Sequence, residues 1–259
     1  MRDAGLALDD AAWDSPWRVR CVRDKAVLSL GLLVCALALP WWPGGVLTAV
    51  VAGAVLLGPA GVGARTLGRA LVAPAAFLAV GAASLLVTLA WEGRPVVGLA
   101  ASATPAAVVA VRGLAATLAV FVLAATTPMV DLIGALRRAR VPQACLDVTT
   151  VAYRMVFVLL QTARSVRSAQ AARLGYDGRR AALRSTAALV GVVLLRAWSR
   201  AERLESGLAG RGGGDALRTL DPPALASWRF VLASLAVIGL VAAVSVWVPV
   251  PASAAGRAW

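Results

Sequence analysis

The chain has 259 residues, of which 60% are hydrophobic and only 15% are charged. A soluble domain is closer to about 45–50% apolar and about 25% charged, so the composition excludes an ordinary soluble protein. The sequence contains no histidine and three widely spaced cysteines. These counts exclude imidazole ligands and serine–histidine triads, and they give no support to a disulfide framework. We therefore predict an all-α integral membrane protein.

The positive charge is concentrated in one part of the chain. The net charge is +13, and residues 131–229 hold 16 basic and 7 acidic residues, a difference of +9. Basic residues next to apolar runs are typical of the cytoplasmic side of a membrane protein. This distribution favours anionic lipid or an acidic protein surface as the partner. Nucleic acid is not favoured, because no recognition helix or aromatic-plus-basic pattern accompanies the charge.

The N-terminal part combines a charged segment with two short apolar runs. Residues 1–25 carry five basic and five acidic residues. This segment is too long and too acidic for the start of a cleavable signal peptide, so we expect it to stay in the cytoplasm. An apolar run follows at 26–39, then an uncharged loop with two tryptophans at 40–45 and a second apolar run at 46–57. Tryptophans suit membrane interfaces, so this loop is expected on the outer side.

Three longer apolar segments complete the predicted membrane helices. The third run covers residues 70–91, the fourth span lies within 105–125, and the last covers 230–248. Such lengths suffice to cross about 30 Å of hydrocarbon. Basic residues lie in a predicted inner loop at 61–69, and a short turn at 92–95 is expected outside. This alternation predicts about five transmembrane helices with the N-terminus in the cytoplasm.

Arg112 falls inside or at the end of the fourth predicted span. A charged residue at membrane depth costs free energy and is therefore a candidate functional residue. The simpler alternative is that its side chain extends to the outer headgroups from near the start of that helix.

Two glycine-containing segments resemble phosphate-binding loops only superficially. Residues 58–63 have the glycine spacing, but Ala64 and Arg65 stand where a lysine and a hydroxyl residue would contact phosphate and magnesium. The glycines at 212–214 follow a predicted helix rather than a strand, which indicates a helix stop and a flexible link. We expect no ATP hydrolysis, no catalytic residue, and no bound cofactor or metal in this chain.

Residues 128–219 are expected to form a helical cytoplasmic module. Thr127 and Pro128 suit the N-cap and the first position of a helix. A second helix is predicted over residues 142–173 and a third over about 180–209. The second helix is apolar in its first half and rich in arginine in its second half. It is therefore expected to leave the lipid and follow the inner membrane surface.

The third predicted helix carries two parallel rows of residues. Its apolar row has spacings of 4, 3, 4, 3 and 4, which predicts a narrow packing seam. This row consists of Val190, Leu194, Ala197, Ala201, Leu204 and Leu208. A basic row of Arg196, Arg200 and Arg203 lies beside it, and the second helix adds Arg164 and Arg167. These arginines form a supporting basic face, or they only solvate a surface helix and contact lipid headgroups.

Two other arginines occupy the C-terminal tips of the long helices. Arg173 lies in the tripeptide Ala172-Arg173-Leu174, and Arg211 lies in Gly210-Arg211-Gly212. A lone arginine at a helix end is explained by compensation of the helix dipole. Two such tips with small neighbours favour guanidinium groups that enter a partner's groove and bind carboxylate and carbonyl oxygens.

Several motifs together point to one family. They are the segment from Ser15-Pro16-Trp17 to Lys25, Thr127-Pro128 followed by Leu136 to Pro142, Tyr153-Arg154, and both arginine tripeptides. In these motifs the sequence resembles the transmembrane (T) component of energy-coupling factor (ECF) importers, most closely the cobalt-type branch. The resemblance covers nearly the whole chain.

The resemblance implies that short Ala-Arg-Gly-type motifs end two coupling helices and dock into grooves on two ABC ATPase subunits. The first motif here has Leu174 in place of glycine, and the second has Gly210 in place of alanine. A small substrate-binding membrane (S) subunit is the implied third partner, within the lipid bilayer of the cell membrane. The implied cargo is cobalt or nickel, although related T components serve biotin and other vitamins.

The expected organisation has four parts. They are a cytoplasmic N-terminal segment at 1–25, a four-span membrane domain at 26–127, a coupling module at 128–219, and the last transmembrane helix with an outer tail at 220–259.

Three other functions are compatible with a multi-pass membrane chain. A conventional ABC permease carries substrate itself and needs polar residues along its path, of which the predicted spans offer few beyond Arg112. A membrane enzyme is disfavoured because the sequence lacks histidine and paired aspartates in its spans. A passive membrane anchor would recruit no ATPase.

Overall fold

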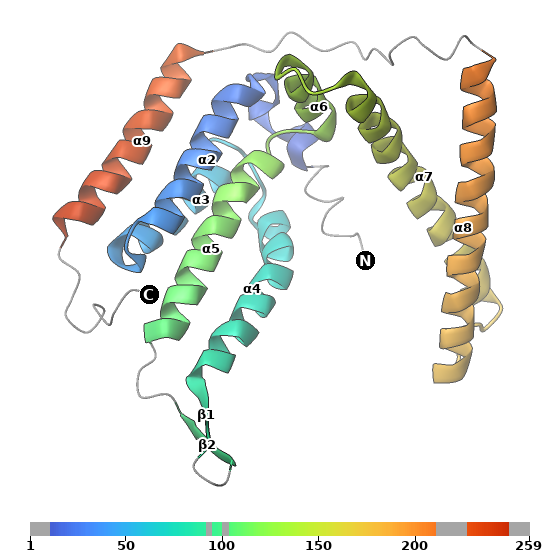
Figure 1. The fold of residues 1–259 in the computed structure, drawn as a ribbon, viewed down its shortest axis with the longest axis horizontal. Helices are drawn as coiled ribbons and strands as arrows, with labels where there is room; N and C mark the ends of the chain where they lie inside the picture. The colour runs from blue at the N-terminus through green and yellow to red at the C-terminus, as the bar shows by residue number, and fades with distance from the viewer. Residues whose placement is uncertain (1–10, 92–94, 100–103, 211–226, 249–259) are drawn as a thin grey trace. The chain divides into compact units, whose positions relative to one another are not determined.

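The computed structural model describes residues 11–91, 95–99, 104–210 and 227–248, and these are almost entirely helical (Figure 1). The chain divides into two compact units, one formed by residues 1–132 and 222–259 and the other by residues 133–221. Within the described ranges, five helices are long and apolar enough to cross a membrane. The predicted fold class, an all-α multi-pass membrane protein, is confirmed, with the addition of one short β-hairpin.

The first unit consists of a helix bundle and this hairpin. In chain order its main elements are α2 (Val22–Ala38), α3 (Val46–Leu57), α4 (Ala64–Leu86), β1 (Val87–Trp91), β2 (Pro95–Leu99), α5 (Thr104–Ala124) and α9 (Trp228–Trp247). Two short helical turns, η1 (Pro16–Val19) and η2 (Trp41–Gly45), precede α2 and α3. Strand β1 pairs antiparallel with β2, with Val87 opposite Leu99 and Trp91 opposite Pro95.

Helix α5 is the centre of the first unit, because it packs against α2, α3 and α4, while α9 packs against α2 (Figure 1). The core is aliphatic: Leu32 of α2, Leu56 of α3 and Val122 of α5 are fully buried. Helices α2 and α5 approach closely at Ala119 of α5, a small residue that is fully buried. At this point Ser29 Oγ of α2 donates a hydrogen bond of 2.8 Å to the Ala119 carbonyl.

The third apolar run folds differently from the prediction. The sequence predicts a span over residues 70–91, with Arg65 and Arg69 in the preceding loop. In the structure α4 begins at Ala64 and ends at Leu86, so both arginines lie in its first two turns. Residues 87–91 form strand β1. The prediction was wrong because hydropathy does not mark a helix end within a run that stays apolar.

Helix α6 (Met129–Arg138) begins directly after Thr127-Pro128, as predicted, with Asp131 in its first turn. The predicted cap is wrong, because Oγ1 of Thr127 is buried and has no hydrogen-bond partner among the described residues. The preceding Thr126 instead donates from its Oγ1 to the carbonyl of Val122 at 2.6 Å, which closes the end of α5.

The second unit is dominated by α7 (Gln143–Ala172) and α8 (Arg179–Ala209), which form an antiparallel hairpin (Figure 1). Both helices agree with those predicted over 142–173 and 180–209. A proline before α7 and glycines after each helix supplied the signals for these bounds.

Helices α7 and α8 bury almost no side chains within the described chain. Leu146 is buried at the start of α7, and α8 has no buried residue. The predicted seam of α8 is therefore not packed here: Val190 and Leu194 are 62% and 64% exposed. The periodicity identifies an apolar face of the helix, but the described unit supplies nothing to cover it.

The number of candidate spans agrees with the prediction, but their membership differs. Helices α4, α5, α7, α8 and α9 have the length and hydropathy of a span, whereas α2 has 17 residues and α3 has 12. At 1.5 Å per residue, α2 is about 25 Å long and α3 about 18 Å. The sequence-based assignment counted these two short helices as spans and placed α7 and α8 in the cytoplasmic module.

Candidate functional site

The first arginine motif lies where α7 ends in a closed backbone turn. The N–H of Gly175 donates to the carbonyl of Gln170 at 2.9 Å, and the N–H of Leu174 donates to the carbonyl of Ala171 at 3.0 Å. This is a Schellman arrangement, which satisfies the last carbonyls of a helix. Arg173 is the C-cap residue and is exposed. Because backbone N–H groups close the helix, the Arg173 guanidinium is not required as its cap.

Leu174 has a left-handed backbone conformation, with φ of 57°. Glycine usually occupies this place in a Schellman turn, and a residue with a side chain costs roughly 1–2 kcal/mol there. The Leu174 side chain is 74% exposed, so burial within the chain does not offset that cost. The departure from Ala-Arg-Gly therefore leaves local strain at the tip of the motif.

A side-chain network holds the turn against the start of α8. Gln170 Nε2 donates to the carbonyl of Ser185 at 3.0 Å, and Ser185 Oγ donates to the carbonyl of Gly175 at 2.6 Å. Tyr176 Oη donates to Gln170 Oε1 at 2.8 Å. The Arg167 guanidinium lies 5.7 Å from the centre of the Tyr176 ring, within cation–π range. These contacts join both helices and fix the turn.

Gly175 is required by close packing. A Cβ at this position would lie 2.7 Å from Ser185 Oγ and 2.9 Å from the carbonyl oxygen of Gln170. Both distances are shorter than real Cβ atoms tolerate, and one neighbour is backbone. The glycine that follows Leu174 therefore lets the network approach the chain, a role that the sequence alone does not reveal.

The second motif begins at Gly210, the C-cap residue of α8. Its φ of −69° and ψ of −13° are helical values that any residue adopts. A Cβ there would meet nothing closer than the Ser206 carbonyl oxygen at 3.6 Å, an ordinary contact. Alanine therefore fits at this position, as in the usual Ala-Arg-Gly pattern. Arg211 and Gly212 lie outside the described residues.

The hairpin places the two motifs at opposite ends of α8. Arg173 lies just before the turn that leads into α8, whereas Gly210 closes the other end of that helix. Helix α8 has 31 residues, so at 1.5 Å per residue its ends are roughly 46 Å apart. Arg173 and Gly210 are therefore separated by about the length of α8.

The predicted supporting arginines are all exposed. They are Arg164 and Arg167 of α7 and Arg196, Arg200 and Arg203 of α8. Arg167 contributes directly to the first motif through its contact with Tyr176. The three arginines of α8 form an exposed basic row, which suits either anionic headgroups or an acidic protein surface.

Residues 14–220 match the family of the cobalt transport protein CbiQ. The chain is also 39% identical over 222 residues to the cobalt transport protein CbiQ of Rhodobacter capsulatus, which covers 85% of this chain and 90% of that protein. The chain belongs to the CbiQ family. The predicted resemblance to the cobalt-type T component is thereby confirmed.

Two further relatives extend this CbiQ comparison. The cobalt transport protein CbiQ of Salmonella typhimurium is 26% identical over 212 residues, covering 78% of this chain and 94% of that protein. A Methanocorpusculum labreanum protein named as a fused cobalt transport protein CbiMQ is 28% identical over 210 residues. That match covers 76% of this chain but only 35% of the fused protein.

A buried polar cluster lies at the start of α2, and the sequence-based predictions for this CbiQ-family chain assigned it no role. Lys25 is fully buried, and its Nζ donates to the carbonyl of Thr126, just beyond α5, at 2.9 Å. The neighbouring Asp24 accepts a hydrogen bond of 3.0 Å from the N–H of Ser227, before α9. This cluster ties α2 to α5 and α9. The available signal was that Lys25 is the only lysine in the sequence.

Arg112 has a partner inside the bundle. Its Nη2 donates at 3.2 Å to the carbonyl of Leu39, the C-cap residue of α2. A guanidinium at a helix C-terminus is stabilised by the helix dipole. The contact joins α5 to the end of α2, an arrangement that neither sequence-based alternative for Arg112 included.

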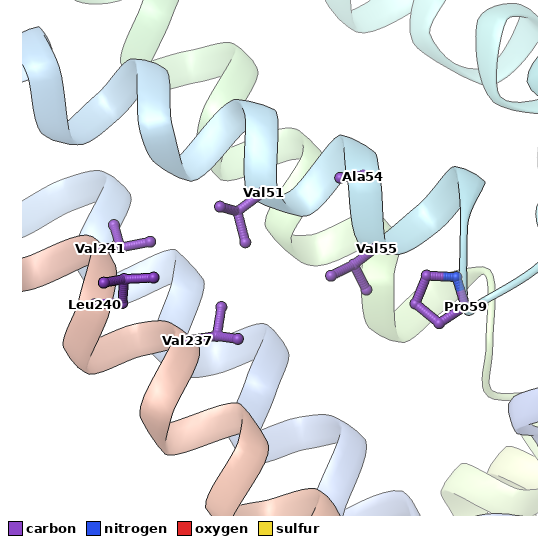
Figure 2. Close-up of a pocket in the computed structure, with 7 residues that line it drawn as sticks. All are labelled: Val51, Ala54, Val55, Pro59, Val237, Leu240 and Val241. Atoms are coloured by element: carbon purple, nitrogen blue, oxygen red, sulfur yellow. The ribbon is translucent and has the colours of Figure 1, made fainter.

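An apolar groove of about 290 Å³ lies between α3 and α9 (Figure 2). It is lined by Val51, Ala54, Val55 and Pro59 on one side and by Val237, Leu240 and Val241 on the other. These side chains offer no oxygen, nitrogen or sulfur ligand to a metal ion. Among the described residues as a whole, no group of three or more Cys, Asp or Glu side chains is placed to hold one.

Proposed function

We propose that this chain is the transmembrane coupling subunit of an ECF-type importer, which passes the motion of two ABC ATPase subunits to a substrate-binding membrane subunit. The observation that carries this proposal is the exposed Arg173 on a turn fixed by backbone bonds and by the Gln170–Ser185 network. A guanidinium presented from a rigid turn loses little conformational freedom on binding and forms charge-assisted bonds with carboxylates. Membership of the CbiQ family supports the same role.

The separation of the motifs supports two ATPase subunits. The first motif is Ala172-Arg173-Leu174 and the second is Gly210-Arg211-Gly212. Because they lie at opposite ends of α8, each would dock into a groove on a different subunit. Helix α8 is continuous, so ATP-driven movement at one end would be transmitted along its length. ATP hydrolysis itself would belong to the partner subunits, and this chain would not be an enzyme.

A small membrane-embedded S subunit is the other proposed partner. The M. labreanum relative is named as a fusion, and the match with this chain accounts for only 35% of it. If two subunits are joined in one relative, the corresponding separate subunits are expected to stay associated. The fusion therefore supports a stable membrane partner for this chain. The exposed apolar face of α8 at Val190 and Leu194 also requires lipid or another membrane protein to cover it.

Cobalt is the proposed cargo, with nickel or a vitamin as alternatives. The names of three relatives refer to cobalt transport. The groove between α3 and α9 is lined only by aliphatic side chains. Cargo recognition is therefore assigned to the S subunit, and this chain is assigned to coupling.

The proposal places the N-terminus and both motifs on the cytoplasmic side of the cell membrane. Helix α8 is long and apolar enough to cross a bilayer, and crossing would put its two ends on opposite sides. Coupling at both motifs therefore requires α8 to lie along the inner face. Single cysteines at Ala172 and Ser206, in a variant without Cys21, Cys35 and Cys145, test this point. Labelling of both from the cytoplasm is expected; labelling from opposite sides would end the coupling model.

Alanine substitution tests the proposed coupling contact directly. Arg173→Ala should weaken association with the ATPase subunits by about 2–5 kcal/mol, because a desolvated charge-assisted contact is lost. The measurement is co-purification of the ATPases and cobalt uptake in cells that express the whole complex. Arg69→Ala is the control, because Arg69 is exposed on α4 and lies outside every motif named above. Membrane insertion should be equal in both variants.

The double variant Arg173→Ala/Arg211→Ala gives the decisive result. A single change leaves one motif to hold the complex, whereas the double change removes both. Normal uptake by the double variant with an intact complex would refute the coupling assignment. Cobalt binding by the purified chain alone would favour a conventional permease instead.

A further inference from the structure

The tip of the α7–α8 turn presents an apolar side chain from a costly backbone conformation. Leu174 has φ of 57° and is 74% exposed. Glycine adopts this conformation without steric cost, so leucine weakens the turn when the chain is alone. A strained residue that its surroundings hold in place is a reason to look for a function at that residue.

The turn fixes Leu174 without using its side chain. The N–H of Leu174 donates to Ala171, and the next residue, Gly175, donates to Gln170 and accepts from Ser185 Oγ. The side chain is therefore presented from a rigid frame. Little conformational freedom remains to be lost when a partner binds it.

The charges around Leu174 indicate the chemistry of the partner. Residues 172–180 carry three arginines, Arg173, Arg179 and Arg180, against one acidic residue, Asp177, and all four are exposed. An apolar tip surrounded by net positive charge is complementary to an apolar pocket with an acidic rim.

We propose that Leu174 is an apolar anchor that inserts into a pocket on the ATPase subunit, beside the acidic groups that receive Arg173. This inference rests on the proposed function and deepens it, because it assigns specificity to the residue that departs from Ala-Arg-Gly. Apolar anchors that fill a partner's pocket carry much of the affinity of protein interfaces. The leucine then selects ATPase subunits whose pocket accepts its size.

An anionic membrane surface is the other partner that a basic and apolar tip fits. A fluid bilayer accepts a leucine in any backbone conformation, so it gains nothing from a strained and rigid one. The fixed conformation of Leu174 therefore favours a pocket of defined shape in a protein.

The test replaces Leu174 by glycine in the full chain. Leu174→Gly removes the anchor and relieves the backbone strain, so the two effects have opposite signs. We expect the unfolding temperature of the isolated chain to stay equal or rise, while the Kd for the ATPase subunit increases about 10- to 100-fold. Leu174→Met should recover most of the affinity. Leu183→Ala is the matched control: Leu183 lies on α8, is also 74% exposed, and should leave the Kd unchanged.

The outcomes separate the anchor from the coupling assignment. Unchanged or tighter ATPase binding by Leu174→Gly would overturn the anchor. The anchor would also be overturned if Leu174→Gly lost binding to liposomes that contain phosphatidylglycerol while its ATPase affinity stayed unchanged. If Arg173→Ala disrupts assembly and Leu174→Gly does not, only the anchor fails. If neither the single variants nor the double arginine variant changes assembly, the proposed function fails as well.

Discussion

Both units of this chain contain long apolar helices, but among the described residues the first unit buries many side chains, whereas α7 and α8 of the second unit bury almost none. In the first unit Leu32 and Val122 are fully buried where α2, α3 and α5 pack. In the second unit Leu146 is buried at the start of α7, and α8 has no buried residue. Apolar sequence therefore forms a core in the first unit and leaves an exposed apolar face on α8 in the second.

The polar contacts of the two units differ in the same way. In the first unit, Lys25 and Ser29 of α2 donate to carbonyls at or near α5, so hydrogen bonds stabilise contacts between helices along the bundle. In the second unit, the contacts of Gln170, Tyr176 and Ser185 gather at one turn. Rigidity is thus concentrated at the end of the hairpin that carries the first motif.

The comparison of burial predicts very different costs for the same substitution in the two units. Leu32→Ala leaves a cavity in the first unit and should lower the free energy of unfolding by about 2–5 kcal/mol. Leu195→Ala removes a side chain that is 70% exposed on α8. This substitution should change the free energy of unfolding by less than about 0.5 kcal/mol. Unfolding in mixed detergent micelles measures both. Equal effects would show that the second unit also has a core.

Loss of the buried cation should affect the first unit strongly. Lys25→Met keeps the length of the side chain but leaves the buried carbonyl of Thr126 without its donor, at a cost of about 1–3 kcal/mol. Arg23→Met is the control, because Arg23 lies in the same turn of α2 and is exposed. If both variants unfold alike, the Lys25 contact contributes nothing to the bundle.

In the second unit the largest effect is expected at the turn. Gly175→Ala places a Cβ against Ser185 and Gln170 and should destabilise the turn by about 1–3 kcal/mol. Hydrogen exchange of the amides between Arg167 and Ser185 should accelerate accordingly. Gly191 lies in the middle of α8, where an added Cβ would meet no atom. Because alanine favours the helix more than glycine does, Gly191→Ala should instead slow the exchange of the α8 amides near residue 191. Slower exchange in Gly175→Ala would contradict the role assigned to the network.

The smallest effect is expected at the other end of α8. Gly210 has helical backbone angles and room for a Cβ, so Gly210→Ala should stabilise this end by about 0.4–1 kcal/mol. The change also restores the usual first residue of the motif. The free energy of unfolding should therefore be equal or higher. Under the proposed coupling role, ATPase affinity should be equal or higher as well, and weaker ATPase binding would show that Gly210 itself is needed for that contact.

The sequence allowed some boundaries to be predicted and not others, for a local reason. Helices α7 and α8 begin and end next to proline or glycine, so their bounds were predicted closely. The end of α4 at Leu86 was missed because apolar residues continue into β1. Composition and charge sufficed for the membrane fold, since neither depends on long-range contacts.

The sequence revealed the position of the first motif but not the contacts around it. The position of Arg173 before a glycine break is a local pattern, so the motif was visible in the sequence. The network around it was not, because Gln170 and Ser185 are 15 positions apart and meet only when the hairpin closes. The left-handed conformation of Leu174 was missed for a related reason: the pattern showed leucine in place of glycine, but not that the backbone keeps the shape suited to glycine.

The burial of Lys25 also provides a chemical probe of this protein. It is the only lysine in the sequence, so no other side chain carries a primary amine. While α2, α5 and α9 remain together, amine-selective reagents cannot reach it. Acylation at this single position, read by mass spectrometry, would therefore record each opening of the bundle, and the many arginines would not obscure the signal.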